Sequence, residues 1–331
     1  MMSFDNIKLE KELYTTGKSF TQALEAIDPS ENYKGTALEG LDAYQRQLKR
    51  FDIKVSGADS DTVSKFFQSS DSSALFPEYV SRAVRQGLVE SDVVSRIVAS
   101  TTNIDSLDYR AIESIVDEEA TPNEHIMEGA YIPEINVSLN SSLTKLNKRG
   151  RMLVASYEAI KFQKLDVFTV ILKQIGEYIA RCQTADALTA IIDAKGSDVS
   201  TLTGGVSYDN LVDFWNAFAP YNLTTIVTDP TTMASMLKLS EFKDAVAGLN
   251  FHGTGSMITP FGASLIKTDF LKGQKTIIGL DKNFALEKVQ AGEIVTDFDK
   301  LIDRQLERAT VSCIAGFSPI FDGASKIASY S

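Results

Sequence analysis

A regular spacing of hydrophobic residues marks the segment from Gly150 to Ala187. This spacing of three and four positions places the hydrophobic side chains on one stripe of an α-helix, with charged residues on the other faces. The pattern predicts a helix from Leu165 to about Ala194, which would be roughly 45 Å long. A long rod between an extended arm and a compact lobe is typical of a subunit that tiles a surface. The residues of the stripe are Leu165, Phe168, Leu172, Ile175, Ile179 and Cys182.

The first 73 residues are predicted to form an arm rather than a domain. Short helical patterns, such as the one at residues 38–51, alternate with breakers that contain glycine, proline and aspartate. Too little continuous hydrophobic sequence is present in this part of the chain to bury a separate core. The polar tract at residues 68–73 is predicted to be a linker.

The rest of the chain predicts an α+β fold. Pro77 suits the first turn of a helix, and the alternation of hydrophobic and polar residues at 135–140 predicts a strand. A compact mixed lobe is expected at residues 204–290, with a helix that begins after Asp229. Further strands are expected at 151–157, 223–228, 263–268, 276–280 and 311–320, and residues 298–308 are expected to be extended or weakly helical.

Composition narrows the class of protein. The 331 residues, of which 44% are hydrophobic, suffice for one large or two ordinary domains. No hydrophobic run approaches the roughly 18–20 residues that span a bilayer, and charge near the start of the chain argues against a signal peptide. The net charge of −11 argues against a general nucleic-acid-binding surface, because such a surface needs a basic stripe. Cys182 and Cys313 are expected to be buried, reduced thiols, with a disulfide as the alternative.

Candidate chemistry is sparse. A hydrolase needs a nucleophile, a base and an orienting acid, whereas the two histidines, His125 and His252, are each expected in a surface turn or loop. The glycine-containing segment at 251–256 lacks the lysine of a phosphate-binding loop. Asp297, Asp299 and Asp303 lack the glycine and the glutamate of an EF-hand. The chain is therefore predicted not to be an enzyme and to hold no cofactor or metal.

The order of several short segments resembles that of the major capsid proteins of tailed bacteriophages, which have the Hong Kong 97-type fold. Each segment is short, so the resemblance lies in their order and spacing, and it covers about residues 74–329. The segments are ALFPEYV at 74–80, MEGAYIP at 127–133, GRMLVASYE at 150–158, IVTDP at 226–230, FALE at 284–287 and RQLERATVSCIAGF at 304–317.

The resemblance implies a division of the chain. It implies an N-terminal arm at residues 1–73 and an axial domain at 204–288. It also implies a peripheral domain at 74–203, which includes an extended E-loop at about 107–148 and a spine helix at about 165–194. Residues 289–331 would return to the peripheral domain.

The resemblance also implies a structural function. The chain would be a major capsid protein that self-assembles through pentamers and hexamers into an icosahedral head shell around the double-stranded DNA of a tailed phage or prophage. It would be assembled in the bacterial cytoplasm and located in the virion. Expected partners are further copies, a portal and head-completion proteins, with a separate scaffold left open, DNA by proximity only, and no membrane. The alternative is an encapsulin-type nanocompartment shell that holds protein cargo; the long N-terminal arm favours the virus.

Charge is distributed unevenly around the predicted E-loop. Residues 108–134 contain eight acidic side chains and one basic one, while residues 145–164 contain six basic side chains and one acidic one. An ordinary solvated surface would mix the two signs. The resemblance implies that the E-loop lies over an adjacent subunit, so we predict that its acidic arm meets the basic segment of that neighbour, with pairing inside one chain as the alternative. The candidate contact residues are Asp117, Glu118, Glu119, Lys148, Arg149 and Arg151.

A second basic cluster lies within the predicted arm. It consists of Arg46, Lys49, Arg50 and Lys54. These side chains would either touch DNA inside a shell or form a solvated helical face.

Overall fold

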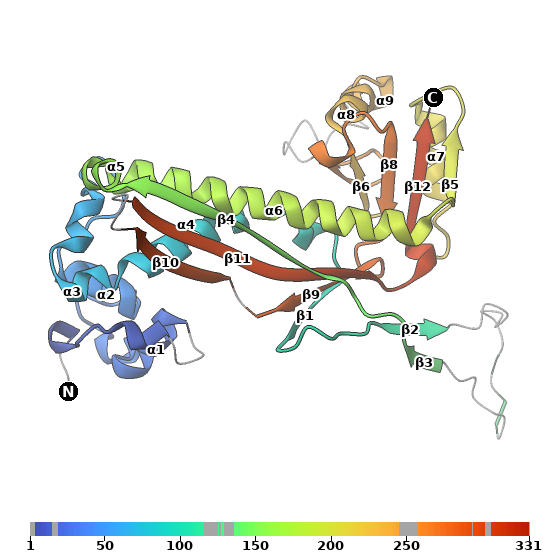
Figure 1. Cartoon of the computed structure of the whole chain (residues 1–331). Helices are drawn as coiled ribbons and strands as arrows, with labels where there is room; N and C mark the ends of the chain where they lie inside the picture. Colours follow the sequence, from blue (N-terminus) through green and yellow to red (C-terminus); the bar gives the residue numbers. More distant parts are fainter. Residues whose placement is uncertain are drawn as a thin grey trace. The chain divides into compact units, whose positions relative to one another are not determined.

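The structure, a computed structural model, describes residues 4–14, 19–115, 125, 127–128, 136–244, 257–292, 294–301 and 306–330 (Figure 1). Its contacts divide the chain into two compact units. The first unit comprises residues 1–91, 149–180 and 294–313, and the second comprises 92–148, 181–293 and 314–331. Helix α6 (Leu165–Lys195) and strand β11 (Leu306–Pro319) contribute residues to both units.

Helices make up most of the first unit. They are α1 (Phe20–Ile27), α2 (Ala43–Arg50), α3 (Ser70–Ser73), α4 (Phe76–Glu90), α5 (Tyr157–Phe162) and the first half of α6. Short 3-10 helices lie at Phe4–Asn6, Lys11–Tyr14, Ser30–Tyr33 and Val63–Phe67. The strands are most of β4 (Leu146–Ser156), β10 (Val295–Leu301) and the first half of β11. Strands β10 and β11 are antiparallel, with Val295 opposite Ser312.

The helix predicted from Leu165 is confirmed. Helix α6 begins at Leu165, ends at Lys195 and buries the predicted stripe as far as Ile179. It approaches α4 closely at two glycines. A Cβ atom added to Gly87 would lie 2.2 Å from the carbonyl oxygen of Lys173, and one added to Gly176 would lie 2.1 Å from that of Val84. The backbones of α4 and α6 are therefore in contact at a place where no other residue type fits.

Residues 19–67 are packed into the core of the first unit and do not form a loose arm. They contribute to a single core that also contains residues of α4 and α6. The absence of enough hydrophobic sequence for a separate core is consistent with this arrangement, because the core is completed by residues about 100 positions later in the chain. The buried residues of this segment include Phe20, Leu24, Tyr44, Leu48, Ile53, Val63 and Phe66.

The polar tract at 68–73 contains a helix, so the prediction of a linker is wrong. The hydroxyl of Ser69 accepts a hydrogen bond from the backbone amide of Ser72 and caps α3. Ser72 is buried, and its hydroxyl donates to the carbonyl oxygen of Phe66 at 2.7 Å. Serine side chains here satisfy backbone groups locally, which a count of polar residues does not reveal.

A five-stranded sheet organises the second unit. Its order is β5 (Val199–Leu202), β12 (Ser325–Tyr330), β8 (Thr276–Leu280), β6 (Thr225–Thr228) and β7 (Ser264–Lys267). Figure 1 labels the first four of these strands. Helices α7 (Tyr208–Asn216), α8 (Pro230–Leu237) and α9 (Ser240–Lys243) contribute Leu211, Met236 and Phe242 to its core. The strands predicted at 223–228, 263–268 and 276–280 and the helix predicted after Asp229 are confirmed.

The end of the chain differs from the prediction. Strand β12 pairs antiparallel with β8, with Ile327 opposite Ile278, and parallel with β5, with Ile327 opposite Val199. Residues 325–330 therefore belong to the sheet of the predicted axial region, and the predicted return to the peripheral domain is wrong for them. This strand contains small and polar residues, so its identity depends on partners distant in sequence.

The remaining strands that the structure describes in the second unit belong to two further sheets. Strand β1 (Ser100–Ile104) is parallel to β9 (Leu286–Ala291), and β9 is antiparallel to the second half of β11. Strands β2 (Ile112–Ile115) and β3 (Asn136–Leu139) form an antiparallel pair within the predicted E-loop. The strand predicted at 135–140 is thereby confirmed, and the segment predicted to be extended or weakly helical at 298–308 lies in β10 and β11 where it is described.

Candidate functional site

The six predicted contact residues are placed unevenly. Asp117, Glu118 and Glu119 lie outside the described residues, while Lys148, Arg149 and Arg151 lie on β4. Lys148 is exposed and Arg149 is half-buried. The guanidinium of Arg151 lies over the ring of Tyr178 on α6, 3.7 Å from its centroid. The three basic residues of the predicted charge pairing thus lie on one strand, and a cation–π contact with Tyr178 holds the side chain of Arg151 in place.

An apolar face of the β2–β3 pair is exposed. Ile112 lies directly opposite Leu139, and Val137 lies two positions before Leu139, so the three side chains share one face of the pair. Their exposed fractions are 54% for Ile112, 66% for Leu139 and 65% for Val137. A two-stranded pair with an uncovered hydrophobic face is marginally stable in water. This face is therefore a candidate for contact with another surface.

A second exposed apolar face lies on the first half of α6. Val167, Val170 and Ile171 follow the spacing of a helical stripe, on the side of α6 opposite the buried one. Phe162 at the end of α5 is 74% exposed. This face is not among the features predicted from the sequence, although hydrophobic residues on two sides of a helix are a detectable signal of a second partner.

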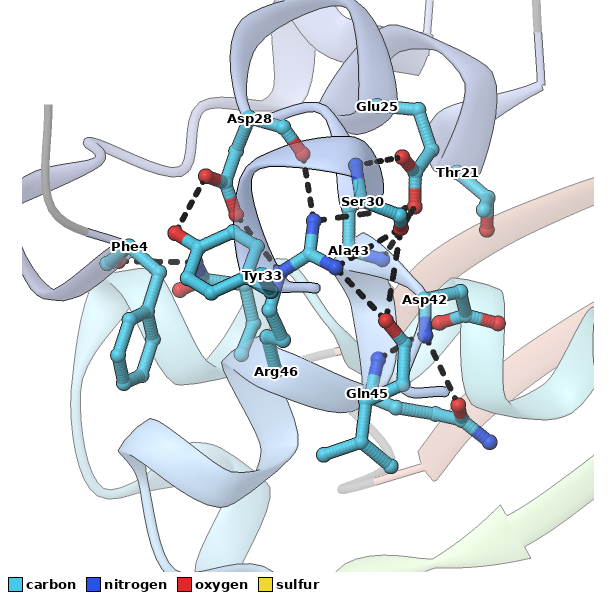
Figure 2. Close-up of polar contacts among 12 residues, drawn as sticks. Phe4, Thr21, Glu25, Asp28, Ser30, Tyr33, Asp42, Ala43, Gln45 and Arg46 are labelled. Carbon is cyan, nitrogen blue, oxygen red and sulfur yellow. Dashed lines mark hydrogen bonds and ion pairs between the residues drawn. The ribbon is translucent and has the colours of Figure 1, made fainter. Parts of the chain in front are cut away.

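The polar network in Figure 2 is centred on Arg46. The side chain of Arg46 is completely buried, and Asp28 beside it is 3% exposed. The guanidinium donates from Nε to Asp28 Oδ2 at 2.8 Å and from Nη1 to the hydroxyl of Ser30 at 2.9 Å and the carbonyl oxygen of Leu41 at 2.7 Å. Its centre lies 4.4 Å from the ring centroid of Tyr33, whose hydroxyl donates to Asp28.

This burial corrects the sequence analysis. A fully buried Arg46 neither touches DNA nor belongs to a solvated face. Arg50 donates to the carbonyl oxygen of Ile7 at 2.7 Å, which leaves Lys49 as an exposed member of the cluster on α2. Arg46 and Arg50 thus bind parts of the N-terminal segment to one another, whereas Lys49 faces solvent. Arg46 is buried because the chain between α1 and α2 folds around it.

Two carboxylates of the N-terminal segment are stabilised in their ionised form. Burial alone would raise the pKa of Glu25, but hydrogen bonds from the hydroxyl of Ser30 and the amide of Ala43 lower the pKa below its usual value. Burial alone would likewise raise the pKa of Asp61, but hydrogen bonds from the amide of Lys54 and the side chain of Lys65 outweigh this effect and lower the pKa below its usual value. Both carboxylates therefore stabilise the fold in their charged form.

The lowered pKa values of these two carboxylates make the stability of the fold depend on pH. A carboxylate with a lowered pKa contributes stability above its unfolded-state pKa, and the contribution is lost as the pH falls through the folded-state pKa. Replacing Glu25 with glutamine is expected to reduce the difference in unfolding free energy between about pH 7 and about pH 3. Urea denaturation at both pH values measures this, with the exposed Glu31→Gln as the control. An unchanged pH dependence in the Glu25 variant would contradict the prediction.

The histidines and aspartates considered for catalysis and metal binding are exposed wherever the structure describes them. His125 is exposed, whereas His252 and the segment at 251–256 lie outside the described residues. Among the described residues, no group of three or more histidine, cysteine, aspartate or glutamate side chains is placed to hold a metal ion. Cys313 is buried and Cys182 is half-buried, and neither forms a disulfide. None of the described helices is long and apolar enough to cross a membrane.

A family model for phage capsid proteins matches residues 140–304 of the chain. The matched region contains α6, helices α7, α8 and α9, strands β5 to β9, and the basic residues of β4. No curated protein matches the chain by sequence.

Solved structures have the same fold. The chain is similar to the virus-like particle protein from Pyrococcus furiosus, with 12% identity and a TM-score of 0.51 over 76% of this chain and 98% of that one. It is similar to the capsid of a native GTA particle, with 15% identity and a TM-score of 0.52 over 71% and 89%. It is also similar to a chain of Gordonia phage Cozz, with 16% identity and a TM-score of 0.52 over 72% and 87%. These likenesses confirm the predicted Hong Kong 97-type fold.

Proposed function

We propose that this chain, a phage capsid protein with the Hong Kong 97-type fold, forms the closed head shell of a tailed phage or prophage from pentamers and hexamers. The observation that carries the proposal is the phage capsid match at residues 140–304 on a chain with this fold. An encapsulin-type nanocompartment shell would use the same fold, and the phage match favours the head shell. The chain is a structural protein of the virion capsid and not an enzyme.

The exposed apolar faces support association between copies. The β2–β3 face and the face on α6 are uncovered in the single chain, and their burial would remove hydrophobic area from water. A second copy is the partner available in a self-assembling shell. Part of the stability of β2–β3 would then come from assembly.

Assembly is tested by light scattering after size exclusion at micromolar concentration, with electron microscopy of the largest species. The expected result is a concentration-dependent conversion of small oligomers into closed particles. A species that stays monomeric in every salt and crowding condition would contradict the proposal.

The charge asymmetry around the E-loop leads to a more specific proposal. We propose that Asp117, Glu118 and Glu119 of one copy face Lys148, Arg149 and Arg151 of a neighbour. Exposed charge pairs are individually worth about 0–1 kcal/mol, and they affect register and association rate more than strength. Changing all three acidic residues to lysine is therefore expected to block or slow shell assembly, measured by light scattering, while circular dichroism stays unchanged.

A rescue experiment separates contact between chains from pairing within one chain. The second variant carries Lys148→Glu, Arg149→Glu and Arg151→Glu. Mixing this variant with the acidic-to-lysine variant is expected to restore co-assembly if the contact joins two copies. If rescue requires both sets of changes in one chain, the pairing is internal. Normal assembly of the acidic-to-lysine variant at physiological salt overturns the charge proposal altogether.

The remaining assignments follow the same proposal. We propose that three parts of the chain correspond to the domains of this fold. They are an E-loop at about 107–148, a peripheral domain that contains α6, and an axial domain at about 204–288. Further proposed partners are a portal and head-completion proteins, with assembly in the bacterial cytoplasm. Packaged DNA is proposed to lie close to the shell without strong adhesion, since a net charge of −11 per chain gives little counterion release.

A further inference from the structure

The N-terminal segment at residues 19–67, which we call the clamp, makes three kinds of contact with α4 and α6. We propose that the clamp is a permanent part of the subunit that stays bound to these helices even when the chain is cut after Gln68. The inference goes beyond shell formation, because it concerns each single subunit. It means that a protease acting at this exposed point would nick the subunit without removing the clamp.

The first kind of contact joins the clamp to the beginning of α6. The backbone amide of Leu165 donates to the carbonyl oxygen of Asp61 at 2.8 Å, and the amide of Val63 donates to that of Gln163 at 3.0 Å. The first amides of a helix have no partner within the helix. Asp61 thus satisfies the first amide of α6, and removal of the clamp would leave it without this acceptor.

The second kind of contact is a polar network centred on Arg82 of α4. Its guanidinium donates from Nη1 to Asp42 at 2.8 Å and from Nη2 to the hydroxyl of Thr21 at 2.7 Å. Thr21 in turn donates to Glu78 of α4 at 2.6 Å. The guanidinium lies 4.4 Å from the ring centroid of Tyr44 on α2. One side chain of α4 is therefore bound by both helices of the clamp.

The third kind of contact is a cluster of aromatic rings. The ring of Phe66 in the clamp lies 5.6 Å from that of Phe76 and 5.4 Å from that of Tyr79, both on α4. Phe66 and Tyr79 are buried, and Phe168 of α6 stacks against Tyr79 at 6.4 Å. Loss of the clamp would expose these rings to water, which strongly disfavours its release.

The clamp is also held in shape by its own residues. The buried Arg46 joins α1, the following loop and the start of α2, and Lys65 pairs with Asp52 and Asp61 at 3.2 and 3.1 Å. A segment that is already ordered loses little conformational entropy when it binds. In contrast, Gln68, Ser69 and Ser70 are exposed, so a protease can reach the connection to α3.

The test uses the full chain with a site-specific protease sequence inserted after Gln68. After cleavage, size exclusion under native conditions is expected to recover both fragments together at equal molar amounts, and to separate them only in denaturant. Elution of the N-terminal fragment alone under native conditions overturns the proposal, whether the remainder stays soluble or aggregates. The measurement is made on unassembled subunits, so a failure to form shells would affect the proposed function and leave this result intact.

A second variant tests the contacts themselves. Arg82→Met in the cleavable chain is expected to release the fragment at least ten times faster in mild denaturant than the unsubstituted cleaved chain. The exposed Gln86→Met on the same helix is the matched control and is expected to leave the rate unchanged, because Gln86 donates to Glu90 within α4. Equal release rates for all three proteins would show that the Arg82 network does not hold the clamp.

Discussion

Replacing Gly176 with alanine is expected to destabilise the first unit, although alanine is the better helix former. In an exposed helix the same change would stabilise by about 1 kcal/mol. Here the new Cβ atom would lie 2.1 Å from the carbonyl oxygen of Val84, which belongs to the backbone of α4 and cannot rotate away. The two helices must separate, and overpacking of this kind costs about 1–3 kcal/mol or more.

Chemical denaturation of the unassembled subunit, followed by circular dichroism, measures this effect. Gly87→Ala on α4 is expected to behave in the same way, because its Cβ atom would lie 2.2 Å from the carbonyl oxygen of Lys173. Gln174→Ala on α6 and Gln86→Ala on α4 are the controls, since both glutamines are exposed. A gain in stability in either glycine variant would show that the helices do not touch at these residues.

Replacing Arg46 with methionine is expected to lower the unfolding free energy by about 3–5 kcal/mol, because it leaves the carboxylate of Asp28 buried without its partner. The ion pair is dry, with both side chains almost inaccessible to solvent. The variant also removes the donors to Ser30 and to the carbonyl oxygen of Leu41. Denaturation curves of Arg46→Met and of the exposed Lys49→Met on the same helix give the comparison.

A double variant separates the ion pair from simple packing. Adding Asp28→Leu to Arg46→Met removes both charges, and a buried ion pair replaced on both sides by apolar groups is often nearly neutral. The double variant is therefore expected to be more stable than Arg46→Met alone. A loss in Arg46→Met no larger than that in Lys49→Met would contradict the structural role assigned to Arg46.

Local signals in the sequence predicted several elements correctly. The stripe beginning at Leu165 predicted α6, the Asp229-Pro230 pair predicted the start of α8, and the apolar run at 276–280 predicted β8. Such patterns succeed because a helix or strand buries residues at its own fixed period, and a cap bonds to amides within three residues. The order of short segments led to the capsid fold for a related reason, since several of them mark local elements, such as ALFPEYV at the start of α4 and IVTDP at the end of β6.

Other features depended on contacts between distant residues. Arg46 was assigned to solvent or DNA because its charge gives no sign that Asp28 and Leu41 surround it. The exposed face at Val167, Val170 and Ile171 was not predicted, because the buried stripe that begins at Leu165 was by itself enough to predict the helix. For the predicted contact site, the sequence identified the charged residues, and the structure placed only the basic ones, on β4.

The sequence by itself therefore determined the long helix, six of the twelve described strands and the capsid fold class, through periodicity, capping and segment order. Only the tertiary structure decided that residues 19–67 belong to a shared core, that β12 joins the sheet of the second unit, and that Gly87 and Gly176 are needed. The physical reason is that burial is a property of both partners in a contact. Neither Phe66 nor Ile327 carries information about the residue, far along the chain, that excludes water from it.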